Sequence, residues 1–297
     1  MLSTLEPMPT MLLLPPVVEG LSDVFEPHHK AAIVDIWGVL HNGKDIYPHA
    51  IETLRRMRDA GIVICLLSNA PRRASTVANR LAAMGLSPGL YHYLVTSGEL
   101  VFEAFSSDNH PDYASFGKRY LHVGPPELAG LLAGLDRQSV DIGDQPDFVL
   151  CTGNDATLDR YAWQVIAARD LPMICANPDL TVDVGDEVVV CAGTVAAHYT
   201  ALGGRVFHHG KPHLDTYRRV SRWLGQDAAS IVAIGDALAT DIAGANGAGM
   251  TSVLIAGGIH KAELGIQWGE TPSKGRLEIV FGKSAVVPTF VSPTLRW

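Results

Sequence analysis

Four short segments of the chain carry acidic, hydroxyl, amide or lysine side chains of the kinds found at catalytic, anion-binding and metal-binding sites. The first contains Asp35, which directly follows the apolar run Ala31–Val34. A lone acid at the end of a buried strand is costly without a partner, so a catalytic or metal-binding carboxylate would explain it. A helix cap or a structural hydrogen bond would explain the same acid, and this segment alone leaves both interpretations open.

The second and third segments offer groups that bind anions. Ser68 and Asn69 follow the apolar run Ile62–Leu67, and a hydroxyl and backbone N–H groups just before a helix can hold a phosphate. Lys211 lies between a glycine and a proline, and a lysine can neutralise a phosphate. An ordinary turn and a solvated surface lysine are the alternatives for these two segments.

The fourth segment contains two acids. Asp236 comes shortly after the apolar run Ile231–Ile234, and Asp241 follows it five residues later. Carboxylate oxygens in such an arrangement suit a hard cation such as Mg²⁺, which prefers oxygen ligands. The alternative is the first turn of a helix, where the macrodipole favours acids.

The elements that must position these segments follow from the alternation of apolar runs with helical periodicity. Strands are predicted at residues 31–35, 62–67 and 93–96, with helices between them, and this order is typical of a parallel sheet with right-handed crossovers. In such sheets, sites form at the carboxyl ends of the strands. Further strands are expected at residues 119–123, 147–151, 173–175, 187–191, 205–208, 231–234 and 251–255.

We therefore expect an α/β fold with a Rossmann-like, doubly wound parallel-sheet core that is made of two separated segments. The last three predicted strands return to the first sheet, and a smaller α/β domain is inserted before them. A Leu-rich helix near residues 126–135 and a helix N-capped by Thr194 belong to the insert. Turn signals at Ser107–Pro111 and Gly203–Gly204 mark the linkers. The expected boundaries are 1–98 for the first core segment (1–25 an N-terminal extension), 99–204 for the insert, and 205–297 for the second core segment and tail.

The composition and charge of the chain argue against several classes of function. The chain of 297 residues carries 23 Lys and Arg against 31 Asp and Glu, a formal net charge of −8, which argues against nucleic acid as a partner. The apolar stretch Met11–Val18 is short, is broken by prolines and has no basic residue before it, so we expect neither a signal peptide nor a membrane span. The four cysteines are scattered in apolar runs, as in a reduced, cytoplasmic protein.

Taken together and in this chain order, the acid, hydroxyl, lysine and acid-pair segments resemble the motifs of the haloacid dehalogenase-type phosphatase superfamily. The insert between the hydroxyl and lysine segments resembles the C2-type cap of its class IIA branch. The resemblance covers roughly residues 30–260. Further matches are Tyr47–Ala50, Val95–Gly98, Asn177–Asp179 and Gly210–Pro212.

The resemblance implies a role for each motif residue. Asp35 matches the nucleophile that forms an aspartyl-phosphate. Ser68, Asn69 and Lys211 match the groups that bind the phosphate. Asp236 matches a Mg²⁺ ligand, with Asp35 and the backbone carbonyl of Trp37 as co-ligands, and Asp241 matches an acid in the outer shell of the metal.

Trp37 departs from the family pattern. Phosphatases of the superfamily usually carry a second aspartate two residues after the nucleophile, which protonates the leaving group and then activates water. An indole N–H is a donor that does not titrate near neutral pH, so Trp37 cannot do this work. His41 or His49 is a candidate replacement, because histidine titrates in the right range, but a histidine without a catalytic role is the plainer interpretation of each.

Three hypotheses follow for the activity. The first is a Mg²⁺-dependent phosphatase of a small phosphorylated metabolite, such as a sugar or glycerol phosphate. The second, motivated by Trp37, is a phosphometabolite-binding or regulatory protein with little or no turnover. The third is a phosphotransferase that uses Asp35 as a relay to an acceptor other than water. In each case the insert offers a surface for a homodimer.

Overall fold

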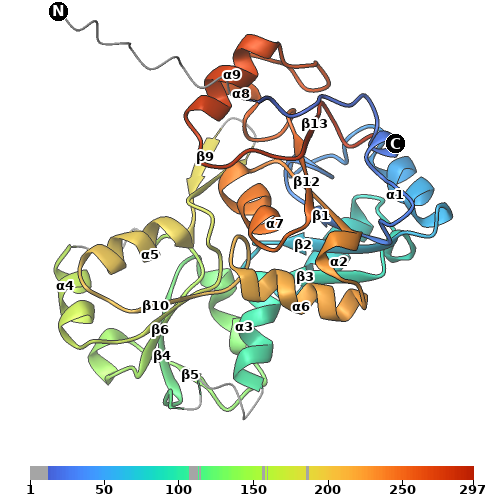
Figure 1. The fold of residues 1–297 in the computed structure, drawn as a ribbon. Helices are drawn as coiled ribbons and strands as arrows, with labels where there is room; N and C mark the ends of the chain where they lie inside the picture. Colours follow the sequence, from blue (N-terminus) through green and yellow to red (C-terminus); the bar gives the residue numbers. More distant parts are fainter. Residues whose placement is uncertain (1–12, 107–112, 114, 156–157, 159, 185–186) are drawn as a thin grey trace, which may run out of the picture.

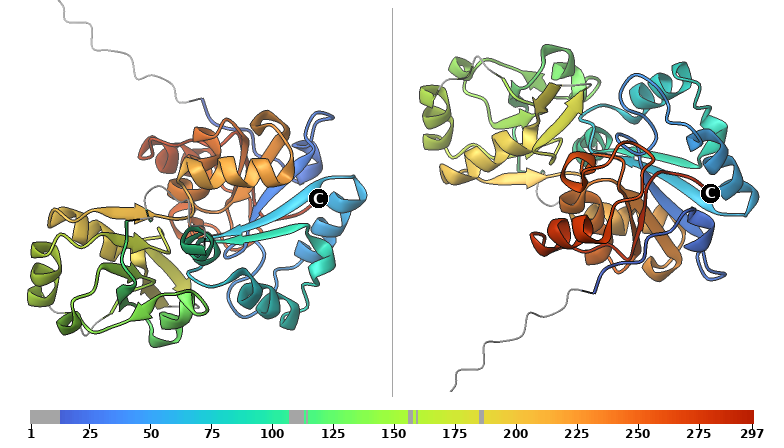
Figure 2. Two further views of the ribbon diagram at one scale, coloured as in Figure 1. Left: turned by 90° about the horizontal axis from the view of Figure 1, so that it is seen from below. Right: turned by 90° about the horizontal axis from the view of Figure 1, so that it is seen from above.

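The chain folds into two lobes that lie side by side (Figures 1 and 2). The computed structural model describes residues 13–106, 113, 115–155, 158, 160–184 and 187–297. Within these residues the larger lobe, called the core below, contains a six-stranded sheet, and the smaller lobe, called the cap, contains a five-stranded sheet. A separate two-stranded hairpin runs between them.

The core sheet has the strand order β13-β12-β11-β1-β2-β3, and every pairing in it is parallel. The two central strands, β1 and β11, are buried along their whole length, as expected for apolar runs covered by helices on both faces. The strands are β1 (Ala31–Asp35), β2 (Val63–Ser68), β3 (Tyr93–Thr96), β11 (Ile231–Gly235), β12 (Thr251–Ile255) and β13 (Phe290–Ser292).

Helices cover both faces of the core sheet, which confirms the doubly wound arrangement. Ala32 and Val34 of β1 pack with α1 and α2 on one face, whereas Ala31 and Ile33 pack with α6 and α7 on the other. These helices are α1 (Ala50–Asp59), α2 (Ala74–Ala83), α6 (Leu214–Leu224) and α7 (Ala243–Gly247), and α8 (Lys261–Leu264) and α9 (Lys274–Gly282) lie over β12 and β13. No helix in the described segments is long and apolar enough to cross a membrane.

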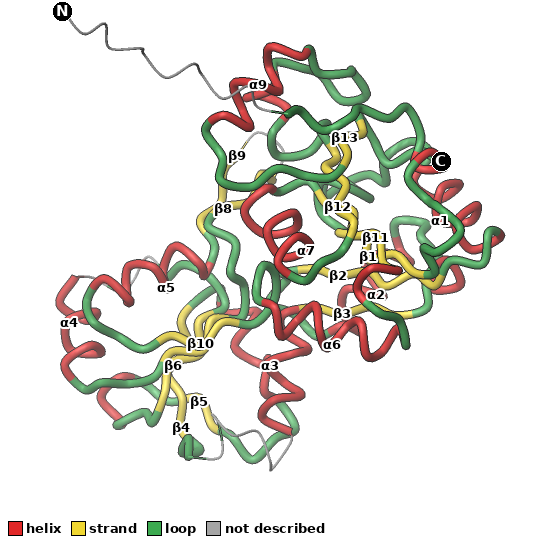
Figure 3. The backbone as a smooth tube through the Cα atoms, in the orientation of Figure 1, coloured by secondary structure: helices red, strands yellow, loops and turns green. Residues whose placement is uncertain are grey.

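The cap is built on the same plan at a smaller scale. Its sheet has the order β10-β7-β6-β4-β5, again parallel throughout, and the hairpin β8–β9 leaves it on the side of the core (Figure 3). Helices α4 and α5 cover one face, and α3 with a 3₁₀ helix covers the other. The elements are α3 (Ser97–Ser106), β4 (Arg119–Val123), η3 (Pro126–Leu132), β5 (Gln138–Ser139), β6 (Phe148–Cys151), α4 (Arg160–Ala168), β7 (Met173–Cys175), β8 (Thr181–Val184), β9 (Glu187–Val190), α5 (Ala192–Ala201) and β10 (Val206–His208).

One predicted strand belongs to the other sheet. The strand at residues 205–208 is expected in the core, but β10 pairs with β7 at the edge of the cap sheet. A three-residue strand carries too little pattern to specify its partner, which is why this expectation is wrong. Gly203–Gly204 therefore lies inside the cap, in the turn between α5 and β10, and is not a linker. We propose that the cap ends at His208; the other linker signal falls at residues 107–111, outside the described residues.

Two helix predictions in the cap also need correction. The Leu-rich helix is a 3₁₀ helix over Pro126–Leu132, shorter than the helix expected near residues 126–135. Pro125 and Pro126 open the segment and Gly130 weakens it, so a regular α-helix is not sustained. Thr194 lies inside α5, which begins at Ala192, so it is not the N-cap; its hydroxyl donates to the carbonyl of Leu180 at 2.7 Å.

The beginning and end of the described chain are held together at the core. The N–H of Val18 donates to the carbonyl of Val291 in β13 at 2.8 Å, and the N–H of Leu21 donates to the carbonyl of Arg296 at 2.7 Å. The Trp297 ring packs on Phe25 with 5.5 Å between ring centroids. The C-terminal segment is thus an integral part of the core packing.

Candidate active site

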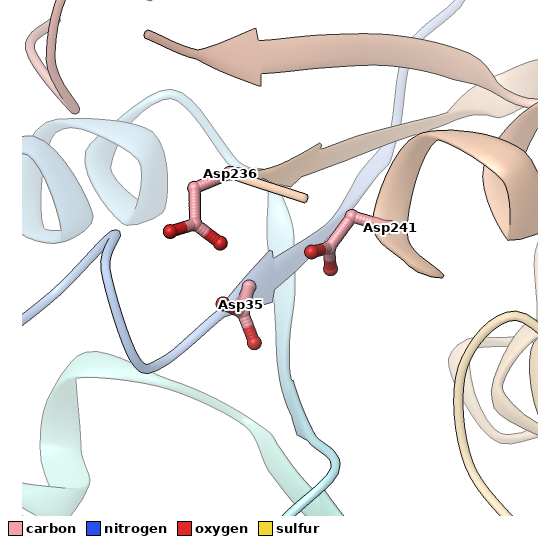
Figure 4. Close-up of side chains that lie close together, drawn as sticks. All are labelled: Asp35, Asp236 and Asp241. Carbon is pink, nitrogen blue, oxygen red and sulfur yellow. The ribbon is translucent and has the colours of Figure 1, made fainter. Parts of the chain in front are cut away.

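Asp35 is the last residue of β1, and Asp236 directly follows the neighbouring strand β11, so both lie at the carboxyl ends of the core strands. Strands β1 and β11 are in parallel register, with Val34 opposite Ile234, so the residues at their carboxyl ends lie together. Asp241 comes from the π-helical turn that follows β11, and all three acids are buried. Figure 4 shows the three side chains grouped together beyond the end of β1.

These three carboxylates form a compact acidic cluster, in which one oxygen from each lies within 4.8 Å of the others. Burial, opposed by Lys211 and reinforced by Asp241, raises the pKa of Asp35 to about 7. Burial and the charges of Asp35 and Asp241 raise the pKa of Asp236 well above its ordinary value. Such crowded negative charge favours a cation, and carboxylate oxygens are the ligands that Mg²⁺ prefers, so the residues fit this ion.

Lys211 supplies a positive charge to the same cluster. Its ammonium group donates to Oδ1 of Asp35 and, at 2.7 Å, to Oδ1 of Asp241. Although burial lowers the pKa of Lys211, the carboxylates of Asp241 and Asp35 raise it well above its ordinary value. A lysine this buried and this well paired stays charged, and it compensates part of the negative charge of the site.

The side chain of Asn69 joins the core to Lys211 and to the cap. Its Oδ1 accepts from the N–H of Lys211 at 2.7 Å and from the hydroxyl of Ser97 at 3.2 Å. Its Nδ2 donates to the carbonyl of Lys211 at 3.0 Å and to Oδ1 of Asp179 at 2.8 Å. Gly210 makes this close approach possible: its φ is 108°, and a Cβ there would lie 2.4 Å from Oδ1 of Asn69.

The loop after β1 approaches the acidic cluster through a glycine. Gly38 has a φ of 81°, and a Cβ at this position would lie 1.9 Å from Oδ2 of Asp236. The same Oδ2 accepts from the N–H of Ile259 at 2.8 Å, which fixes the carboxylate in place. Oδ2 of Asp241 accepts from the N–H of Ala237 at 3.2 Å. Backbone groups therefore orient both acids that follow β11.

A cavity of about 470 Å³ opens above the cluster, between the core and the cap. The cap contributes Asp179, Thr181 and Val182 to its wall. On the core side, the rings of Tyr47 and Trp268 stack at 5.2 Å and form an aromatic wall. A cavity of this size accommodates a small organic phosphate.

Trp37 occupies part of the wall near Asp35. Its ring packs edge-on against His41 at 5.2 Å, with the Arg80 guanidinium 5.8 Å from the ring centre. Burial and the charge of Arg80 lower the pKa of His41 to about 4, and its Nδ1 accepts from the N–H of Gly43 at 2.9 Å. His49 is exposed at the start of α1, and neither histidine is among the described residues that line the cavity.

The structure brings all the residues singled out from the motifs to one place. They line the same cavity: Asp35, Trp37, Ser68, Asn69, Lys211, Asp236 and Asp241. The aromatic pair Tyr47 and Trp268 was not among the predicted site residues, and no spacing in the sequence connects two residues so far apart. From the sequence, Asp179 is only the last residue of the motif match Asn177–Asp179, and its hydrogen bond with Asn69 places it at the site.

Comparisons with protein families and with known proteins point to the same superfamily as the sequence motifs. The model of the haloacid dehalogenase-like hydrolases matches residues 32–138, and a second HAD-hydrolase-like model matches residues 208–274. A dihydroxyacetone phosphatase of Corynebacterium glutamicum is 34% identical over 241 residues, which cover 76% of this chain and 81% of that protein. A D-glycerol 3-phosphate phosphatase of Mycobacterium tuberculosis is 28% identical over 90% of this chain and 70% of its own length.

A solved structure extends the similarity to the whole fold. The crystal structure of a haloacid dehalogenase-like hydrolase from Brucella suis superposes with a TM-score of 0.76 and 30% identity, covering 94% of this chain and all of that one. Motif residues, two-lobed architecture and relatives thus agree. The chain belongs to the haloacid dehalogenase superfamily, in the class IIA branch of phosphatase-like hydrolases.

Proposed function

We propose that the protein is a Mg²⁺-dependent phosphatase that acts on a small phosphorylated metabolite, such as a sugar or glycerol phosphate. One observation carries this proposal: Lys211 donates to both Asp35 and Asp241 in the cavity that Ser68 also lines. Phosphoryl transfer depends mainly on positioning and on charge stabilisation, and this arrangement supplies both. The relatives named as dihydroxyacetone and glycerol 3-phosphate phosphatases support the size of the substrate.

In the proposed reaction, an oxygen of Asp35 attacks phosphorus, and the bond to the leaving oxygen breaks. The electron pair of that bond stays with the leaving oxygen, and an aspartyl-phosphate remains on Asp35. Water then attacks the phosphorus and gives up a proton, and the electron pair of the aspartyl bond returns to the carboxylate. The leaving oxygen takes up one proton, so the products are the alcohol and inorganic phosphate. Lys211 favours the ionised form of Asp35, while the Ser68 hydroxyl and the Asn69 backbone N–H orient the phosphoryl oxygens.

Asp35, Asp236 and the backbone carbonyl of Trp37 would hold Mg²⁺. When bound, the ion neutralises negative charge on the phosphoryl oxygens. Asp241 suits the outer shell, because its two oxygens already accept hydrogen bonds from Lys211 and from the N–H of Ala237. Its part is then to keep Lys211 charged and directed at the nucleophile.

A phosphate-release screen tests the proposal. Purified wild type, Asp35→Asn and Trp37→Asp are assayed on a panel of alkyl and aryl phosphate esters, with Mg²⁺ and with a chelator. We expect metal-dependent release by the wild type and none by Asp35→Asn, because the amide cannot attack phosphorus. Absence of release from every ester, by the wild type and by Trp37→Asp alike, would refute the phosphatase assignment.

The indole of Trp37 favours a second candidate function, a phosphometabolite-binding or regulatory protein that retains the phosphate site and has little turnover. The same screen distinguishes the two functions. If the wild type releases no phosphate and Trp37→Asp does, the phosphate site is intact and turnover is absent only because of the residue at position 37. Thermal stabilisation of the wild type by phosphate esters without product formation would then support the binding function.

A further inference from the structure

The proposed reaction needs a proton donor that residue 37 does not supply. The described titratable groups lining the cavity besides the nucleophile are Lys44, Tyr47, Asp179, Lys211, Asp236, Asp241 and Lys261. Lysine carries its proton throughout the neutral range, so it does not exchange one readily there. Burial and the charge of Asp236 raise the pKa of Tyr47, which weakens this phenol as an acid.

Among the remaining acids, only Asp179 is placed outside the charged cluster. Asp241 accepts a hydrogen bond from the ammonium group of Lys211, and Asp236 is one of the proposed metal ligands. Asp179 comes instead from the cap, in the loop between β7 and β8, and it belongs to the part of the cavity wall that the cap contributes. A leaving group lies opposite the attacking oxygen in an in-line displacement, so an acid on the cap side is on the appropriate side of the phosphate.

The position of Asp179 is fixed by both lobes. Its Oδ1 accepts from Nδ2 of Asn69 in the core at 2.8 Å. Within the cap, its N–H donates to Oδ1 of Asn177 at 3.0 Å, and its carbonyl accepts from the N–H of Gly193 at 3.1 Å. Gly193 allows this approach, because a Cβ there would lie 2.5 Å from the Asp179 carbonyl oxygen. The carboxyl group is therefore held beside the phosphate-binding segment and is not a mobile surface acid.

The environment of Asp179 also favours a carboxyl group that keeps its proton to higher pH than usual. Burial raises its pKa, and this effect outweighs the opposing influence of Lys211 and of the hydrogen bond from Asn69, while Asp241 adds to the increase. General acids work best when their pKa lies near the working pH.

We propose that Asp179 replaces the missing aspartate at position 37 as the general acid and base of the reaction, supplied by the cap. The inference rests on the proposed phosphatase activity. In the first step the carboxyl proton of Asp179 passes to the leaving oxygen as its bond to phosphorus breaks. In the second step the Asp179 carboxylate takes a proton from the attacking water. The products are the alcohol and inorganic phosphate, and Asp179 ends protonated as it began.

The test compares the wild type, Asp179→Asn and the double variant Asp179→Asn/Trp37→Asp on two esters in the presence of Mg²⁺. One is p-nitrophenyl phosphate, whose leaving group departs without a proton. The other is the alkyl phosphate that the wild type hydrolyses fastest in the panel. Asp170→Asn, an exposed carboxylate of the same cap, is the matched control.

For Asp179→Asn we expect a burst of one p-nitrophenolate per enzyme at the wild-type rate, followed by slow turnover. Alcohol release from the alkyl ester should fall about 10²–10⁴-fold and show no burst. The fall of the alkyl rate at high pH, which reports loss of the Asp179 proton, should disappear, whereas the fall at low pH, which reports protonation of Asp35, should remain. Trp37→Asp in the double variant should restore the alkyl activity. Asp170→Asn should behave as the wild type.

Other outcomes overturn the inference. If the burst rate on the aryl ester falls as much as the alkyl rate, Asp179 only positions Asn69. If the double variant does not recover activity on the alkyl ester, an aspartate at position 37 cannot take over the role proposed for Asp179. If the wild type hydrolyses aryl phosphates but no alkyl phosphates, the enzyme has no general acid. These results leave the phosphatase assignment standing, whereas silence of every variant on both esters refutes the assignment and the inference together.

Discussion

At the scale of single residues, Lys211 decides the charge state of the site. Its ammonium group is buried with Asp35 and Asp241, and Asp236 lies beside them. Removing one partner from a buried charge network costs much more than the network contributes as a whole, because the remaining charges stay buried without compensation. The catalytic arrangement and the stability of the metal-free protein therefore depend on the same side chain.

We expect Lys211→Met to lower the free energy of unfolding of the metal-free protein by roughly 3–5 kcal/mol at pH 8. The loss should be smaller at low pH, because Asp35 then binds a proton in both proteins: its pKa is about 7 with Lys211 present and is raised further once the lysine charge, which lowers it, is removed. Urea unfolding in the presence of a chelator, at pH 8 and pH 5.5, measures both values. Lys261→Met, an exposed lysine at the same cavity, is the control; an equal loss at both pH values would contradict the explanation.

At the scale of elements, the site depends on how closely the loop after β1 approaches the acid that follows β11. The two strands are in register, but the side chains meet only because Gly38 lets the loop pass against Asp236. The chain offers a matched comparison, because Gly61 has the same φ of 81°, and a Cβ there would meet no described atom within 4 Å. Backbone strain and collision with the site can therefore be separated.

We expect Gly38→Ala to abolish stabilisation by Mg²⁺ and phosphate release, since its Cβ would displace the Asp236 carboxylate. Gly61→Ala should cost only the strain of its backbone conformation, about 1–2 kcal/mol, and keep both properties. Thermal unfolding with and without Mg²⁺, together with the release assay, checks this. Equal effects of the two substitutions would show that the contact with Asp236 is unimportant.

The strand β10 carries a second pH-sensitive element. His208 stacks on His213 at 4.9 Å, and burial and the charge of His213 lower its pKa to about 4, from an ordinary value of 6.5. The unfolded chain therefore binds this proton more readily than the folded protein. The associated stability is fully present above pH 6.5 and is lost progressively as the pH falls toward 4.

We accordingly expect the free energy of unfolding to decrease between pH 6.5 and pH 4.5, and to decrease less steeply in His208→Gln. Urea titrations across this range measure the slope. His198→Gln, at an exposed position on α5, should keep the wild-type slope. An unchanged slope in His208→Gln would place the acid sensitivity elsewhere.

The central strands of the core could be predicted from the sequence together with their neighbours, whereas the edge strand β13 and the partner of the edge strand β10 could not. Strands β1, β2 and β11 are apolar runs that end in, or are followed directly by, a polar residue, so both the strands and the site at their ends are recognisable from the sequence. Strand β13 was missed because prolines bound a segment of only three residues, Phe290–Ser292. The partner of β10 and the contact of Asp179 with Asn69 depend on how the two lobes pack, which no local pattern encodes.

At the scale of the whole molecule, the two lobes bury every cysteine of the chain. Cys65 lies in the core, while Cys151, Cys175 and Cys191 lie in the cap, and all four are free. Cys151 and Cys175 are opposite each other on neighbouring strands. Burial raises the pKa of Cys191 to about 11 and of Cys175 to about 12, and it raises the others as well, so the reactive thiolate is scarce.

We expect the native protein to resist a thiol reagent such as a disulfide dye, and four thiols to react once the chain is unfolded in urea. Because each lobe must open to expose its own cysteines, the rates report on the lobes separately: Cys65→Ser should remove a signal that belongs to the core. Rapid modification of any one thiol in the native state would contradict the burial of that cysteine.

The first and last parts of the described chain are hydrogen-bonded to each other, and this bears on which lobe is inserted in which. Val18 and Leu21 are bonded to Val291 and Arg296, so a short peptide could join the ends into a closed ring. In such a closed chain, neither lobe can be called the one into which the other is inserted. A circular permutant with new termini at the exposed Gly134 turn of the cap would carry the whole core as one continuous stretch inserted into the cap. The order of the motifs along the chain would change, while the strand pairing that brings them together would remain.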